Sequence, residues 1–232
     1  MTSPDKLPIV VIACQVFQSL LENLFPESLA AHFIFLDYGL HRVPQKLTWT
    51  LQDKINEVEE PSLIILGYGL CGNGLKGINA GEHTLLIPRT DDCIAILLGT
   101  YKKYIQEFET TPGTYYLTKG WLESGSNPLQ EYLEYKEKYG DDDAAWIMDQ
   151  QYQHYERLLF VAHSDEDLEK YRPKAQEVAA YCQRWGMRYE EILGSDIFIR
   201  RLIEVATALD KVDDEFVVIP SGGEIKQEMF MR

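Results

Sequence analysis

The sequence predicts an α/β protein with Rossmann-like parallel sheets, arranged as two lobes joined by an acidic helical segment. Short apolar runs rich in β-branched residues alternate with amphipathic helical segments along most of the chain. Such runs are typical of strands buried on both faces of a parallel sheet. Of the 232 residues, 45% are hydrophobic and 25% are charged, which is ordinary for a globular protein. We therefore expect helices on both faces of the sheets.

The first half of the chain carries most of the strand signals. Strands are predicted at 9–13, 32–36, 62–66, 84–87 and 114–117. A helical stripe from Phe17 ends at Pro26, and a second helix runs from Pro44, tolerated in a first turn, to Glu59. A third helix, capped by Asp91, is predicted to extend as far as Phe108.

The second half begins with an acidic, tyrosine-rich segment at 121–155 that has no strand signal and predicts two or three helices. Strand and helix patterns then alternate at 158–161, 165–185, 188–193, 196–209 and 216–219. We expect an N-terminal lobe at 1–118, a helical insertion or lid at 119–156 and a C-terminal lobe at 157–232. The acidic run 140–143 is interpreted as the start of a helix, with a divalent-metal loop as the alternative. The turn at 221–224 would either bind an anion through its backbone N–H groups or serve as a tight turn.

The charge balance argues against two classes of partner. The chain carries 37 Asp and Glu against 22 Lys and Arg, a formal net charge of −15, and such a surface repels nucleic acid and anionic lipid. No apolar run reaches the roughly 18 residues that a membrane span needs. The apolar run 7–13 reads as a strand and not as an export signal. We expect a cytoplasmic protein whose partner is a small molecule or cofactor.

A Gly-x-Gly-x-x-Gly pattern follows the third predicted strand, at 67–72. In a dinucleotide-binding fold the third glycine opens a helix, and the pattern belongs to the first strand-to-helix turn. Here the chain continues through further glycines with no helical stripe. We interpret the segment as a glycine-rich loop that allows a close approach of the backbone.

Three cysteines and one histidine follow four successive predicted strands. Cys14 ends the first strand, His41 follows the second, Cys71 lies in the glycine-rich loop after the third, and Cys93 follows the fourth. Because the carboxyl ends of parallel strands share one edge of a sheet, these side chains are expected to meet there. Cysteine with histidine suits zinc, and three cysteines with one open position suit an iron–sulfur cluster. The alternative is that each cysteine is a small buried hydrophobe, as we expect for Cys182.

Cys14 and Cys93 also precede predicted helices. A thiolate at a helix N-terminus is favoured by the helix dipole, so we expect both to ionise easily.

Four strings carry a resemblance to a known family: Ile-Ala-Cys at 12–14, Gly-Tyr-Gly-Leu-Cys-Gly-Asn-Gly at 67–74, Pro-Arg-Thr-Asp-Asp-Cys-Ile at 88–94, and Gly-Thr-Tyr-Tyr-Leu-Thr-Lys-Gly-Trp at 113–121. Over nearly its whole length the chain resembles the bacterial and archaeal family called domain of unknown function 1638. The resemblance implies that the three cysteines act together, and it implies a link to anaerobic one-carbon or corrinoid-dependent metabolism.

Three functions remain open from the sequence. The first is a metal- or iron–sulfur-binding protein that uses Cys14, Cys71 and Cys93, with His41, water or a substrate in the fourth position. The second is a metal-free cysteine enzyme with Cys14 or Cys93 as the nucleophile and His41 or His163 as the base. The third is a module that binds a small molecule or cofactor in a cleft between two lobes. The candidate ligand-binding residues are Gly69, Gly72, Asn73, Arg89, Tyr115, Tyr116, Lys119 and Trp121.

Overall fold

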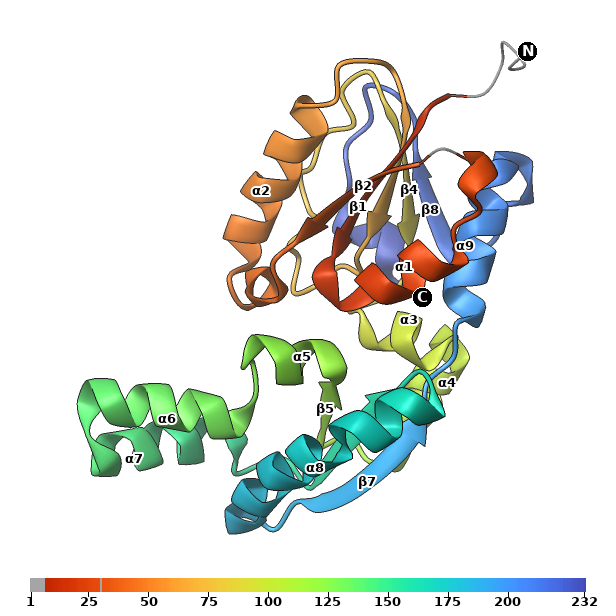
Figure 1. Ribbon diagram of the computed structural model, residues 1–232. Helices are drawn as coiled ribbons and strands as arrows, with labels where there is room; N and C mark the ends of the chain where they lie inside the picture. The colour runs from red at the N-terminus through yellow and green to blue at the C-terminus, as the bar shows by residue number, and fades with distance from the viewer. Residues whose placement is uncertain (1–6, 30) are drawn as a thin grey trace. The chain divides into compact units, whose positions relative to one another are not determined.

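A computed structural model describes residues 7–29 and 31–232 and divides the chain into two compact units (Figure 1). The first unit contains the chain up to Tyr101 together with Asp196–Arg232, and the second contains Lys102–Ser195. Residues 1–6, with which the predicted N-terminal lobe begins, lie outside the described part.

The first unit is built on a five-stranded sheet with the order β2-β1-β3-β4-β8. Neighbouring strands among the first four are parallel, whereas β8 pairs antiparallel with β4. The strands are β1 (Ile9–Cys14), β2 (His32–Leu36), β3 (Leu63–Gly67), β4 (Thr84–Pro88) and β8 (Phe216–Ile219). Every residue of β3 is buried, as its continuous apolar sequence predicts for a central strand.

Helices cover both faces of this sheet. On one face lies α2 (Pro44–Asn56), and on the other lie α1 (Gln18–Leu24) and α9 (Ile197–Thr207), which contact each other (Figure 1). Leu47, Leu51 and Ile55 give α2 its buried stripe. The connection from β3 to β4 holds no helix and consists of turns across the glycine-rich loop.

The strand order creates a topological switch point between β1 and β3. The chain leaves β1 toward β2 on one side of the sheet and returns across β1 to β3 on the other. In open α/β sheets, ligands bind at the carboxyl ends of the strands that flank such a point. At this end Ala13 pairs with Gly67, and a side chain at residue 67 would lie 2.5 Å from the Ala13 Cβ. Only glycine fits there.

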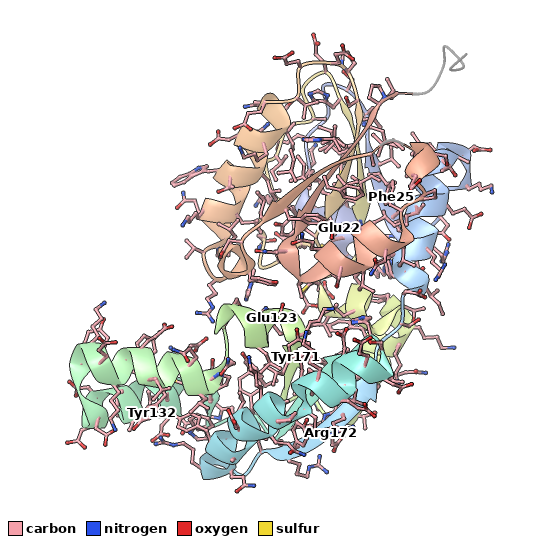
Figure 2. All side chains as sticks on the ribbon, in the orientation of Figure 1. Glu22, Phe25, Glu123, Tyr132, Tyr171 and Arg172 are labelled. Carbon is pink, nitrogen blue, oxygen red and sulfur yellow. The ribbon has the colours of Figure 1, made fainter. Side chains whose placement is uncertain are left out.

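The second unit has a three-stranded parallel sheet with the order β5-β6-β7. Its strands are β5 (Thr114–Thr118), β6 (Arg157–Ala162) and β7 (Arg188–Leu193). Its helices are most of α4 (Tyr101–Thr110), with α5 (Lys119–Ser124), α6 (Pro128–Tyr139), α7 (Asp141–Tyr152) and α8 (Asp165–Cys182). Figure 2 shows Glu123 of α5 and Tyr171 of α8 directed toward each other, where the tyrosine hydroxyl donates to the carboxylate.

The α/β class and the Rossmann-like sheets are confirmed, but the units divide the chain at other residues than the predicted lobes at 1–118, 119–156 and 157–232. The strand β5 pairs with β6 instead of joining the first sheet, so the helical segment and β6 belong with it. The strand β8 returns to β4 and completes the first sheet. Sequence pattern identifies strands but not their partners.

Three local features can be compared with the sequence expectations. The helix predicted from Asp91 to Phe108 is two helices, α3 (Ile94–Leu98) and α4, separated by Gly99 at φ 92°. The acidic run Asp141, Asp142 and Asp143 forms the first turn of α7, as interpreted. At the turn after β8, the N–H groups of Gly222 and Gly223 donate to the carbonyls of Gly81 and Pro220, which makes it a tight turn.

Among the described residues, no helix is both long enough and apolar enough to cross a membrane.

Candidate metal centre at the carboxyl edge of the first sheet

Three cysteines follow three strands that are neighbours in the first sheet. Cys14 is the last residue of β1, Cys71 follows β3, and Cys93 lies between β4 and α3. Because β1, β3 and β4 are adjacent, and neighbouring strands lie about 4.8 Å apart, the strand order places the three cysteines along the same edge of the sheet. Cys14 and Cys71 stand on the two sides of the switch point.

Backbone hydrogen bonds fix the glycine-rich loop beside the segment that carries Cys93. The N–H groups of Leu70 and Cys71 donate to the carbonyls of Thr90 and Asp91, each at 2.8 Å. At Gly69, a Cβ would lie 2.6 Å from the carbonyl oxygen of Asp92. The close approach that this glycine permits is therefore made by the chain's own backbone and not by a ligand.

The backbone at Cys71 is left-handed. Cys71 has φ 49°, Gly72 has φ 63° and Asn73 has φ 72°. A left-handed conformation costs a non-glycine residue roughly 1–2 kcal/mol, and such residues cluster at functional sites. Of the two non-glycine residues, asparagine adopts this conformation more readily, so the strain of the loop lies mainly at Cys71.

The three thiols are buried and interact with one another. Burial is the largest cause of a raised pKa at each, and it raises the pKa of Cys14 from 9.0 to about 11. The pKa of Cys71 lies still further above its ordinary value and that of Cys93 lies well above it, and the charges of Asp92 and of neighbouring cysteines add to the effect of burial at both. Cys93 keeps partial exposure as a residue, yet burial remains the first cause there.

The prediction that Cys14 and Cys93 ionise easily is wrong. The helices that follow them are short, seven residues in α1 and five in α3, and the loss of hydration outweighs what their dipoles supply. The acidic neighbours Asp37, for Cys14, and Asp92, for Cys93, raise the pKa further. These thiols need a positively charged partner in order to ionise at neutral pH.

Alkylation kinetics follow from this electrostatic setting. In the folded, metal-free protein, the two-unit pKa increase at Cys14 lowers the thiolate fraction at pH 7 by about 100-fold. We expect its iodoacetamide labelling rate, followed by mass spectrometry, to rise about tenfold per pH unit from pH 7 to 10 without a plateau. The same cysteine in urea is the control and should level off near pH 9. A plateau near pH 9 in the folded protein would contradict the burial argument.

Tyr68 is a member of this group that the sequence analysis did not single out. It follows β3 directly, and its side chain is almost entirely buried, at 2% exposure. Burial raises the pKa of its phenol, and the charges of Cys14, Cys71, Cys93 and Asp37 raise it further. An aromatic residue between two glycines after a buried strand was the available signal, but its neighbours come from three separate segments.

The two candidate histidines, His41 and His163, lie in different units. His41 is exposed in the short 3-10 helix Tyr38–Arg42 after β2, and its Nδ1 donates to the Tyr38 carbonyl at 2.7 Å. With Nδ1 protonated, Nε2 carries the lone pair that a metal would bind. His163 follows β6 in the second unit.

The other candidate ligand-binding residues of the first unit have identifiable structural roles. A Cβ at Gly72 would lie 3.4 Å from the Pro44 ring, and the Asn73 carbonyl accepts from the N–H of Lys76. The guanidinium of Arg89 forms an ion pair with Asp214 and donates to carbonyls of the C-terminal segment, among them Met229 at 2.7 Å. Arg89 thereby anchors the end of the chain.

The remaining candidates belong to the second unit. Tyr115 packs edge-on against Tyr152 and Tyr155 at centroid distances of 5.6 and 5.7 Å. Lys119 pairs with Asp167 at 3.0 Å, and Trp121 is buried in α5. Tyr116 lies on β5 with a buried hydroxyl. These contacts explain the residues as parts of the packing of this unit.

Within the described part of the chain, no group of three or more His, Cys, Asp or Glu side chains is arranged to hold a metal ion. The four cysteines are free thiols.

Comparison with known protein families identifies the family of the chain. A family model described as "Protein of unknown function (DUF1638)" matches residues 35–203. The chain belongs to this family. The matched range includes Cys71 and Cys93 but begins after Cys14, so it is shorter than the resemblance expected from the sequence. Neither the curated proteins nor the solved structures contain a match to the chain.

Proposed function

We propose that this member of the DUF1638 family binds an iron–sulfur cluster through Cys14, Cys71 and Cys93. The observation that carries the proposal is the placement of three buried thiols after three adjacent parallel strands, where neighbouring cysteines contribute to the raised pKa values of Cys71 and Cys93, at the carboxyl edge of the sheet. Sheets of this kind bind their ligands at that place. Thiolate is the ligand that iron–sulfur clusters use in proteins.

The electrostatics favour a bound cation over a free thiolate. Three neighbouring thiols whose pKa values are all raised stay protonated at neutral pH. A metal displaces those protons and supplies the positive charge that the site lacks. A metal-free cysteine enzyme needs instead a thiol of lowered pKa, so the same observation counts against that alternative.

Three cysteine ligands would leave one position for another group. A cluster bound in this way supplies a Lewis-acidic iron that can take a small molecule, water or His41. The proposal includes a small-molecule or cofactor partner and a cytoplasmic location, where thiols remain reduced. It also includes a role in anaerobic one-carbon or corrinoid-linked metabolism, which rests on the family resemblance alone.

The test is anaerobic purification followed by iron, sulfide and zinc analysis and a visible spectrum on one sample. We expect a brown protein with iron and acid-labile sulfide in equal amounts. Protein that is purified with less than its full content of iron and sulfide is reconstituted with ferrous iron and sulfide and then desalted. Stoichiometric zinc, or a colourless protein that takes up neither iron nor sulfide, would overturn the cluster.

A further inference from the structure

The Tyr68 hydroxyl is a buried polar group without a protein partner. Its oxygen is inaccessible to solvent and has no hydrogen-bond partner among the described protein atoms. Removing a hydroxyl from water without replacing its hydrogen bonds costs free energy. A native structure keeps such a group where something outside the chain satisfies it or where function requires it.

The position of this hydroxyl indicates what satisfies it. Tyr68 lies on the chain between Gly67, which ends β3 at the switch point, and Gly69, which packs on the Asp92 backbone. It therefore stands among the segments that carry Cys14, Cys71 and Cys93, and all three thiols act on it electrostatically. A phenol O–H is a donor, and neutral thiols are weak acceptors. Sulfur becomes a stronger acceptor when it carries negative charge, as in a metal-bound thiolate or an inorganic sulfide.

We propose that the Tyr68 hydroxyl donates a hydrogen bond to a sulfur atom of the cluster, inorganic or cysteinyl, and raises the cluster's reduction potential. This inference rests on the proposed function. Hydrogen bonds to the sulfurs are among the features that set the potential of iron–sulfur clusters, because a donor stabilises the more negative, reduced form. Tyr68 is thus a tuning residue and not a ligand.

The first measurement is a redox titration of the Tyr68→Phe variant, loaded anaerobically and followed by its visible and electron paramagnetic resonance spectra. We expect unchanged iron and sulfide content, because phenylalanine removes no ligand. We also expect the equilibrium constant for reduction of the cluster to fall about tenfold, which corresponds to a reduction potential more negative by about 59 mV for a one-electron couple. Tyr189→Phe is the matched control. It removes a hydroxyl that bonds Glu191 in the second unit and should leave the potential unchanged.

The second measurement is the melting temperature of the metal-free protein. Because the hydroxyl has no protein partner, Tyr68→Phe removes a buried polar group and should raise the melting temperature by about 2–4 °C. A clear fall would show that the hydroxyl bonds the protein and would count against the proposal.

A third variant tests the direction of the effect without removing the hydroxyl. Site-specific replacement of Tyr68 by 3-fluorotyrosine makes the phenol a stronger donor, so the potential should rise above that of the wild type. An unchanged potential in both the phenylalanine and fluorotyrosine proteins, with iron retained, overturns this inference alone. Failure of the wild-type protein to take up iron and sulfide overturns the proposed function and this inference with it.

Discussion

Alanine at Cys14, Cys71 or Cys93 is expected to lower the iron and sulfide content of the loaded protein by about tenfold or more. Each thiolate provides one of three bonds between the chain and the cluster and part of the negative charge that balances its irons. A site reduced to two thiolates loses its irons to solvent or chelators. Iron and sulfide are measured per folded chain after desalting.

The loss of iron should not result from unfolding. A buried cysteine packs as a small hydrophobe, and its truncation to alanine costs on the order of 1 kcal/mol. Circular dichroism and urea unfolding of the metal-free variants check this. The matched control is Cys182→Ala, because Cys182 is fully buried in α8 of the second unit. It undergoes the same chemical change and should keep its iron.

Serine variants separate ligation from packing. A serine oxygen can bind iron, so serine at a true ligand position should retain more cluster than alanine does. At a position that only fills space, a buried serine gains nothing over alanine and carries an unpaired hydroxyl. Full iron content in all three alanine variants would remove these thiols from the proposed role. Full content in one of them would remove that cysteine from the ligand set.

The placement of the cysteines at the carboxyl ends of strands was predictable from sequence because it depends on a general property of parallel sheets. Buried strands such as β1 and β3 are continuous apolar runs, and each cysteine follows one of them. What sequence could not determine was the order of the strands. The order β2-β1-β3-β4 places the three cysteine-bearing strands side by side, whereas another order would have separated them.

Ionisation and hydrogen bonding were less predictable than placement. The position of Cys93 before α3 indicated an acidic thiol, but its pKa depends on burial by segments distant in the sequence. That the Tyr68 hydroxyl has no hydrogen-bond partner among the described protein atoms likewise depends on the packing of the segments around it. Pairing of β5 with β6 and of β8 with β4 also follows from tertiary packing, because the sequence of a short apolar strand does not specify which strand it pairs with.

The largest stability effect is expected at Arg157, the first residue of β6, in the second unit. Its guanidinium is 7% exposed and pairs with Glu107 at 2.8 Å and Glu190 at 3.1 Å, while its Nε donates to Thr114. It thus joins α4, β5 and β7 to β6. Removal of Arg157 deprives both carboxylates and Thr114 of this donor, but Lys103 still pairs with Glu107 at 2.9 Å and Glu190 is 43% exposed, so the cost should be about 1–3 kcal/mol, below that of a fully buried pair. We expect Arg157→Met to lose this much in urea unfolding at pH 7.

The stability loss in Arg157→Met should depend on pH, because it reflects the interaction of the guanidinium with an ionised carboxylate. Arg172→Met provides the comparison with an exposed ion pair. Burial alone would raise the pKa of Glu107, but hydrogen bonds and charges from Lys103 and Arg157 lower it below its ordinary 4.5. A carboxyl with a lowered pKa stabilises the fold above that value, and this stabilisation is lost as the pH falls through the folded pKa. The difference between the wild type and Arg157→Met should therefore narrow below about pH 4.5. Arg172 pairs with Glu191 at 37% exposure, so Arg172→Met should cost much less than Arg157→Met. Equal losses of unfolding free energy in the two variants would contradict the role of burial.

Because the three thiols belong to the first unit, folded Arg157→Met should keep its full iron content. This result would separate the stability of the second unit from the proposed chemistry of the first.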